Sequence, residues 1–163
     1  MSVVEEKGKW KAKWKIIKYK SEEDYKKGII DDILEFDGNL LLNEGINLIW
    51  TLVCGGSGTA FNSTNSYIGV GDGTTAEAVT QTGLQGTNKL YKAMDSGYPT
   101  YGSSQQATWR ATFGSADANF AWNEITVANG SSDTAVNLNR KVQSMGTKVS
   151  GAVWTAQLTV TLS

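Results

Sequence analysis

The chain has 163 residues, a formal net charge of −1 and no histidine, and its length fits one domain of ordinary size. The balanced charge gives no reason to expect nucleic acid as a partner. Histidine is the most common general base and metal ligand, so its absence disfavours most catalytic mechanisms. We therefore expect neither an enzyme nor a cofactor or metal site, and the single cysteine, Cys54, excludes an intramolecular disulfide.

The first residues do not have the pattern of a targeting segment. Glu5, Glu6 and Lys7 make the start of the chain charged, whereas a Sec signal peptide needs an apolar stretch there. No window of 18 apolar residues follows anywhere in the sequence. The sequence predicts a protein made without a signal peptide and without a membrane partner.

Charge is concentrated near the amino terminus. The first 50 residues hold nine of the 15 basic residues and ten of the 16 acidic residues. The segment Asp37-Gly38-Asn39 reads as a turn. We place a boundary there, with a charged N-terminal arm over residues 1–37 and a polar, weakly charged body over residues 38–163.

Residues 9–20 alternate between apolar side chains and lysines, which predicts a strand with one apolar and one basic face. The phase of the alternation slips after Ile16-Ile17, and this slip is interpreted as a β-bulge. Two interpretations remain open. The strand lies at a sheet edge, where lysines prevent aggregation, or it is an arm that lays its apolar face on a neighbouring subunit. In the second case the interface residues are Trp10, Trp14, Ile16 and Tyr19.

One helix is predicted after a short apolar strand at residues 40–42. Asn43 suits the N-cap, and Ile46, Ile49, Trp50 and Val53 recur at helical spacing until Gly55-Gly56 ends the pattern. We expect this helix to pack its isoleucine and tryptophan face against a sheet.

The glycine-rich stretch at residues 69–75 looks like a phosphate-binding loop, but it lacks the Lys-Ser/Thr ending and a following helix. We interpret it as a tight turn whose glycines adopt positive φ. The acids of the body are isolated in sequence, so neither a calcium loop nor a pair of glycosidase carboxylates is indicated.

The C-terminal half has the clearest strand patterns. Residues 106–113 alternate, residues 120–127 alternate with a break in phase near Asn123, and residues 152–162 alternate throughout. The last strand is long and carries threonine on its outer face, which favours the middle of an antiparallel sheet. Glu124 is expected to be half-buried and to form a structural cross-strand ion pair with Arg110 or Arg140.

Seven to nine short strands with turn signals about every 10 residues are typical of a β-sandwich. The expected fold is all-β, an antiparallel β-sandwich or jelly roll with one short helix and an N-terminal β-arm.

An ordered set of segments over residues 38–163 resembles a β-sandwich of tailed-bacteriophage structural proteins, the capsid-decoration and tail-fibre components. The segments are YIGVGDGTTA (67–76), TGLQG (82–86), FAWNEITVANG (120–130), LNRKV (138–142) and GTKVSGAVWTAQLTVTLS (146–163). Residues 1–37 match no motif of this family.

The resemblance implies a virion protein, made in the host cytoplasm, that binds the major capsid protein and other copies of itself as a homotrimer on the capsid surface. Such a decoration subunit stabilises the phage head through protein–protein contacts. The alternative is a tail-fibre module that binds a receptor glycan, with Tyr98 and Tyr101 of the 95–104 loop stacking on sugar rings.

Overall fold

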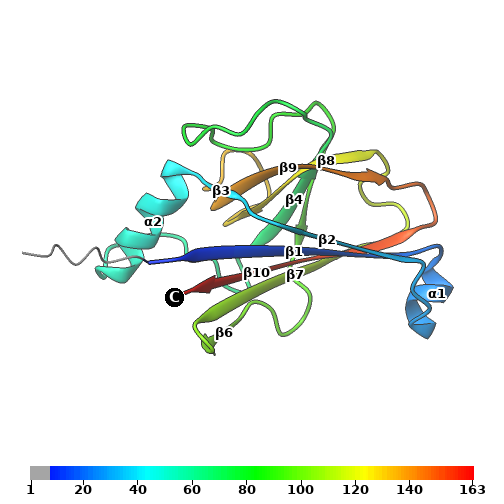
Figure 1. The fold of residues 1–163 in the computed structure, drawn as a ribbon, viewed down its shortest axis with the longest axis horizontal. Helices are drawn as coiled ribbons and strands as arrows, with labels where there is room; N and C mark the ends of the chain where they lie inside the picture. The colour runs from blue at the N-terminus through cyan, green and yellow to red at the C-terminus, as the bar shows by residue number, and fades with distance from the viewer. Residues whose placement is uncertain (1–7) are drawn as a thin grey trace, which may run out of the picture.

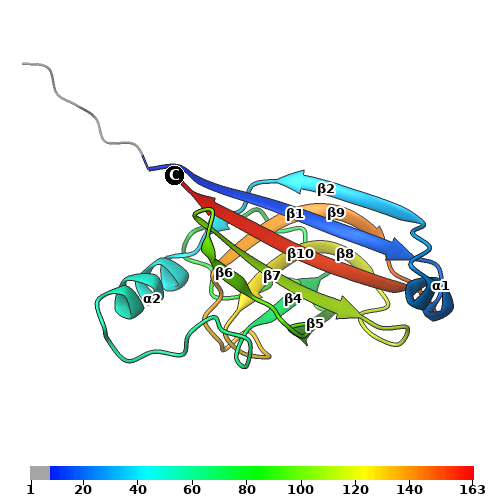
Figure 2. The same cartoon turned by 90° about the horizontal axis from the view of Figure 1, so that it is seen from below.

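The computed structural model describes residues 8–163, so residues 1–7, where the predicted arm begins, lie outside the described part. The chain forms two antiparallel sheets of five strands each (Figures 1 and 2), which confirms the all-β sandwich. Two helices accompany them rather than the single helix expected. The elements are β1 (Trp10–Tyr19), α1 (Glu22–Lys27), β2 (Asp32–Asp37), β3 (Leu40–Leu41), α2 (Asn43–Val53), β4 (Tyr67–Gly71), β5 (Lys89–Ala93), β6 (Thr100–Ser103), β7 (Gln106–Phe113), β8 (Ala121–Ala128), β9 (Asn139–Thr147) and β10 (Val153–Leu162).

The first sheet has the order β2-β1-β10-β7-β6. β1 pairs with β10 without a break in register, from Trp10 opposite Leu162 to Tyr19 opposite Val153. β10 thus lies between β1 and β7, which confirms the central position predicted from its long alternation. β1 is also an interior strand, because β2 covers its other edge.

The interface predicted for the arm is wrong for this reason. Trp14 and Ile16 are fully buried, Tyr19 is 8% exposed and Trp10 is half-buried. The alternation up to Ile16 was read correctly, but this apolar face packs on the chain's own second sheet. The bulge predicted after Ile17 is wrong, because the register of β1 against β10 has no break. The boundary at residue 38 also fails as a limit between an arm and a body, because residues 10–37 supply two strands of the first sheet.

The core lies between the inner faces of the two sheets. Trp122 of β8 makes edge-to-face contacts with Phe113 of β7 and Trp154 of β10, at centroid distances of 4.7 and 4.9 Å. Edge-to-face packing of this kind adds to the free energy gained from burying the rings. The three aromatic side chains therefore join the two sheets at the centre of the sandwich.

The second sheet has the order β3-β9-β8-β4-β5. Its pairing shifts by two residues between Trp122 and Glu124, where β8 lies against β9. This irregularity confirms the phase break predicted near Asn123, and it lets both Trp122 and Ile125 reach the core. Glu124 consequently points to the opposite face of the sheet.

Helix α1 is the helix that the sequence pattern did not predict. Ser21 accepts a hydrogen bond from the backbone N–H of Asp24 and caps the helix, and Gly28 ends it with φ of +70°. Three acidic residues in the first turn and two lysines in the last turn suit the helix dipole. The capping hydrogen bonds and the placement of charges thus stabilise this helix although none of its residues is buried.

Helix α2 has the predicted extent, but its orientation differs from the prediction. Leu42 is the N-cap, and Asn43 is the first helical residue. The buried residues are Gly45 and Leu48, whereas Trp50 and Val53 are 62% and 69% exposed. A Cβ on Gly45 would lie 2.5 Å from the carbonyl oxygen of Leu138. The helix therefore touches the sandwich closely at its start, and its later turns lie away from it (Figure 2).

Candidate functional site

A buried ion pair joins β8 and β9 in the second sheet. The Glu124 and Arg140 side chains are both fully buried, and Arg140 Nε donates a hydrogen bond of 2.8 Å to Glu124 Oε2. Arg110 lies on β7 in the other sheet and pairs with Asp95 at 3.2 Å. Of the two predicted partners, the structure brings only Arg140 to Glu124.

The glycine-rich loop after β4 and the segment that contains Gln85 and Gly86 together surround the same carboxylate. Backbone N–H groups of Gly73, Gln85 and Gly86 donate to Glu124, at 3.3, 2.9 and 2.7 Å. Consecutive amides arranged in this way bind anions. The anion here is the chain's own Glu124, so the phosphate-like appearance of the loop has an intramolecular explanation.

Glycine is required in this loop because a larger side chain would collide with neighbouring atoms. The prediction that these glycines adopt positive φ is wrong. None of the glycines from Gly69 to Gly73 has positive φ. A Cβ on Gly71 would lie 2.4 Å from Glu124 Oε1, and one on Gly73 would lie 2.5 Å from the amide nitrogen of Gly86. The two segments and the carboxylate therefore require side chains of minimal size at these positions.

Two further acids fasten the same loop region. Asp72 accepts hydrogen bonds from the backbone N–H groups of Thr87 and Asn88 and from the Asn88 side chain, and the side-chain bond is the main cause of its lowered pKa. Asp133 accepts from Lys89 and from the hydroxyl of Tyr91. Burial, and then this bond to Asp133, raise the pKa of Tyr91. These contacts are structural.

The acids of residues 8–163 do not gather into a metal site. No group of three or more histidine, cysteine, aspartate or glutamate side chains has the geometry to hold an ion in that part of the chain. The expectation that the protein is not an enzyme stays a prediction.

The two tyrosines predicted to bind glycans differ in environment. The ring of Tyr98 is half-buried, with the Arg110 guanidinium 5.8 Å from its centroid. Tyr101 lies on the edge strand β6 and is 77% exposed. Tyr98 therefore forms an intramolecular cation–π contact. Of the two tyrosines, only Tyr101 exposes most of its ring to solvent.

Exposed apolar side chains occur near both helices, which lie at opposite ends of the long axis (Figures 1 and 2). Next to α1 and on β2, Ile29, Ile30 and Ile33 are 54%, 47% and 44% exposed. We call these three residues the isoleucine end, and we call Trp50 and Val53 the tryptophan end. Sequence reasoning assigned Trp50 and Val53 to the core, because periodicity reports an apolar face and does not say what covers it.

The sheets also leave strand edges open in the described structure. β2 and β6 are the outer strands of the first sheet, and β3 and β5 are those of the second. An edge strand presents unpaired backbone N–H and C=O groups that another strand can pair with. β2 combines such an edge with the exposed Ile33.

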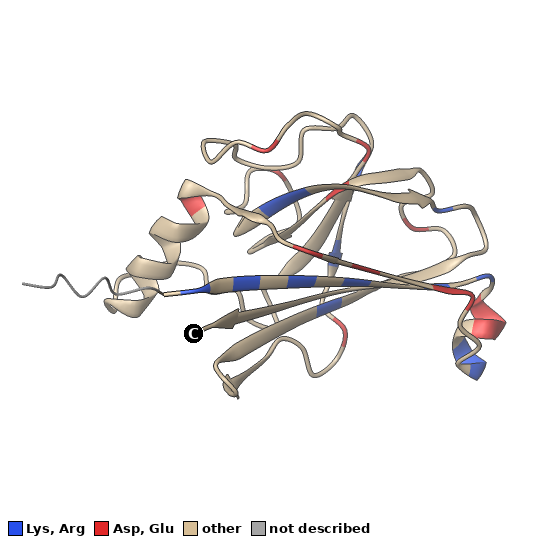
Figure 3. Cartoon of the chain, in the orientation of Figure 1, with Lys and Arg blue, Asp and Glu red and all other residues tan. Residues whose placement is uncertain are grey.

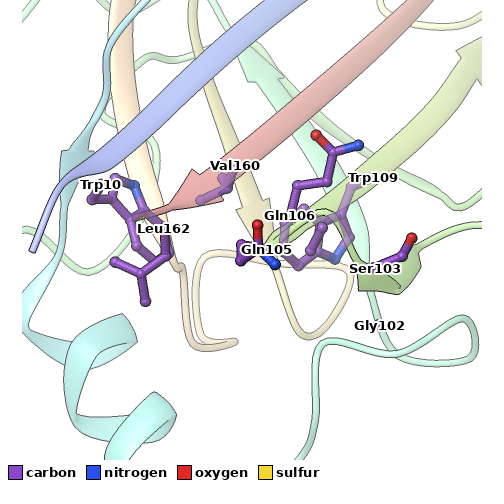
Figure 4. Close-up of a pocket in the computed structure, with 9 residues that line it drawn as sticks. Trp10, Gly102, Ser103, Gln105, Gln106, Trp109, Val160 and Leu162 are labelled. Carbon is purple, nitrogen blue, oxygen red and sulfur yellow. The ribbon is translucent and has the colours of Figure 1, made fainter.

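A pocket of about 410 Å³ opens at the end of the sandwich where β1 begins and β10 ends (Figure 4). Trp10 and Trp109 contribute to its walls together with residues of the β6–β7 hairpin. No sequence pattern indicated this pocket, because its residues come from three separate segments that only the sheet order brings together.

No helix in the described part of the chain is long and apolar enough to cross a membrane. Comparison with protein-family models, with curated proteins and with solved structures found no match to this chain.

Proposed function

We propose that the chain is a virion structural protein of a tailed bacteriophage, a capsid decoration subunit that stabilises the head through protein–protein contacts. The observation that carries this proposal is the presence of exposed apolar side chains at two opposite ends of one small sandwich. Isolated apolar residues on a surface are ordinary, whereas clusters of them mark interaction surfaces. The ordered resemblance of residues 38–163 to phage structural proteins supports the same role.

The contacts that stabilise the head do not come from Trp14 and Ile16, because both side chains are already buried inside the molecule. At the tryptophan end, Trp50 and Val53 lie one helical turn apart and present a compact apolar patch. Tryptophan is enriched at the centres of protein interfaces. We assign this end to contacts between copies of the chain in a homotrimer.

The isoleucine end is assigned to the major capsid protein. Ile33 lies on β2, which is an outer strand among residues 8–163, so a strand of the shell protein has both backbone groups and apolar side chains to pair with. Each copy contributes a modest free energy, and the many copies on a shell together stabilise it.

Substitutions at the two ends test this assignment. In the full-length chain, Trp50→Ser with Val53→Ser should convert the trimer to a monomer, as measured by analytical ultracentrifugation. Ile29→Ser with Ile30→Ser should leave the trimer intact and abolish co-sedimentation with undecorated phage heads. A wild-type chain that is monomeric and binds no heads would contradict the proposal.

The alternative location is the phage tail, and the exposed ring of Tyr101 is the observation that favours it. Electron microscopy of phage particles labelled with an antibody against the chain separates the two. Label over the capsid surface supports decoration, whereas label confined to the tail contradicts it and supports a receptor-binding module.

A further inference from the structure

The pocket at the β1 and β10 end has walls held by the fold. Backbone hydrogen bonds join Lys9 to Ser163 in both directions, at 2.6 and 3.0 Å, and fix the start of β1 beside the end of β10. The N–H of Leu162 donates to the carbonyl of Gln105 at 3.0 Å and attaches the β6–β7 hairpin to the same place. A site fixed in advance loses little entropy when a ligand binds.

The lining of the pocket combines aromatic surface with neutral polar groups. Trp10 is half-buried, and the indole N–H of Trp109 donates to the carbonyl of Phe61 at 3.3 Å, which sets the orientation of that ring. Ser103, Gln105 and Gln106 form the polar side of the pocket (Figure 4). Every residue that lines it is uncharged.

The polar groups of this wall are free to bind a ligand. Ser103, Gln105 and Gln106 are exposed, and the hydrogen bonds of residues 8–163 include none from their side chains. An amide side chain offers two donor hydrogens and an acceptor oxygen, which suits a ligand rich in hydroxyl groups.

The backbone of the hairpin gives an independent indication. Ser104 and Gln105 have φ of +55° and +51°, in the left-handed region where residues other than glycine are strained. Turns of this kind usually contain Asn-Gly or Gly-Gly. Strain of this kind gathers at binding sites, and here it places a glutamine at the mouth of the pocket.

We propose that this pocket binds a neutral saccharide. The apolar C–H face of one pyranose ring packs on the indole of Trp10, and its hydroxyl groups exchange hydrogen bonds with the amide of Gln105. A sugar is apolar on its ring faces and polar at its rim. It therefore complements a site in which the apolar face of an aromatic ring lies beside an amide side chain. The proposal is independent of the capsid role and of Tyr98.

Nuclear magnetic resonance of the full-length chain tests it. The probes are the methyl glycosides of glucose, galactose and mannose, together with N-acetylglucosamine, added to nitrogen-15-labelled protein. At least one of them should shift the indole N–H resonances of Trp10 and Trp109, with a Kd of about 1 mM or below. Gln105→Ala should raise that Kd about fivefold, the effect of losing one hydrogen bond.

Two controls keep the result interpretable. Gln143→Ala, on β9 of the other sheet, should leave the Kd unchanged. Gln105→Gly removes the amide while relieving the positive φ, so it should weaken binding without lowering the melting temperature. If no probe shifts either indole, or if the shifts persist with equal Kd in the Gln105 variants, the saccharide site is wrong. The trimer and head-binding tests would be unaffected by that failure.

Discussion

The two sheets of this sandwich differ in how exposed the charged side chains on their outer faces are. The outer face of the first sheet is open, and β1 carries a row of lysines there (Figure 3), such as Lys13, which lies 3.4 Å from Glu35 of β2 with both side chains about half exposed. The outer face of the second sheet carries Glu124, which the chain's own loops cover completely.

This difference indicates which charged side chains contribute most to the stability of the fold. Exposed ion pairs contribute about 0–1 kcal/mol, because water and salt compete with them. A buried charge that loses its partner costs several times more. The first sheet therefore has a surface that tolerates change, while the second depends on a few glycines, one carboxylate and one guanidinium.

The largest expected effect comes from Glu124→Gln, which leaves the fully buried Arg140 without its counter-charge. We expect the free energy of unfolding to fall by about 3–5 kcal/mol, measured by urea denaturation. Glu35→Gln, the matched change on the open sheet, should cost less than about 0.5 kcal/mol. Equal losses in the two variants would remove the distinction between the sheets.

A double variant sharpens this test. Replacing both members of a buried ion pair by apolar residues is often neutral. Here Glu124→Leu with Arg140→Met should remain destabilised by about 2 kcal/mol or more, because the N–H groups of Gly73, Gln85 and Gly86 lose their acceptor. Full recovery in the double variant would mean that the loop does not depend on the carboxylate.

The next effect in size is that of Gly73→Ala. The added Cβ would lie 2.5 Å from the Gly86 nitrogen and 2.6 Å from Glu124 Oε1, so the loop must move. We expect a loss of about 2–3 kcal/mol in the free energy of unfolding. Gly8→Ala serves as the control, because its Cβ would meet no atom within 4 Å of the described structure. Similar melting temperatures for the two variants would contradict the close packing of the loop.

Asp117 tests an intermediate case, since its side chain is 27% exposed and accepts from Lys92 at 2.6 Å. The bond to Lys92 lowers the pKa of Asp117 below its ordinary 3.8. The ionised form therefore stabilises the fold above the unfolded-state pKa, and this contribution disappears as pH falls through the folded-state pKa. Asp117→Asn should cost about 1 kcal/mol at neutral pH and little at a pH below both values. A loss that does not depend on pH in urea titrations would exclude this ionic contribution.

The smallest expected effect is a gain in the first sheet. Gln105→Gly relieves a φ of +51° and should raise the free energy of unfolding by about 0.5 kcal/mol, because part of the relief is offset by the greater freedom of glycine in the unfolded chain. Gln106→Gly, in the strand beside it, should lower stability instead. Thermal unfolding followed by circular dichroism compares the two, and a loss in both would show that the turn is not strained.

The sequence by itself determined the strands and which side chains share a face. Alternation correctly located β1, β7 and β10, and the phase break near Asn123 correctly located the irregularity in β8. These features follow from local backbone geometry, which repeats every two residues whatever the strand packs against.

Tertiary structure alone decided what covers each face. The apolar side of β1 was predicted to meet another subunit and meets the second sheet, and Trp50, predicted to be buried, lies in the open. Glu124 pairs with Arg140 rather than with Arg110, and backbone N–H groups of the surrounding loops donate to its carboxylate. The burial of each face and the partner of each charged group depend on sheet order and on contacts between residues far apart in the chain. Periodicity in the sequence contains no information on either.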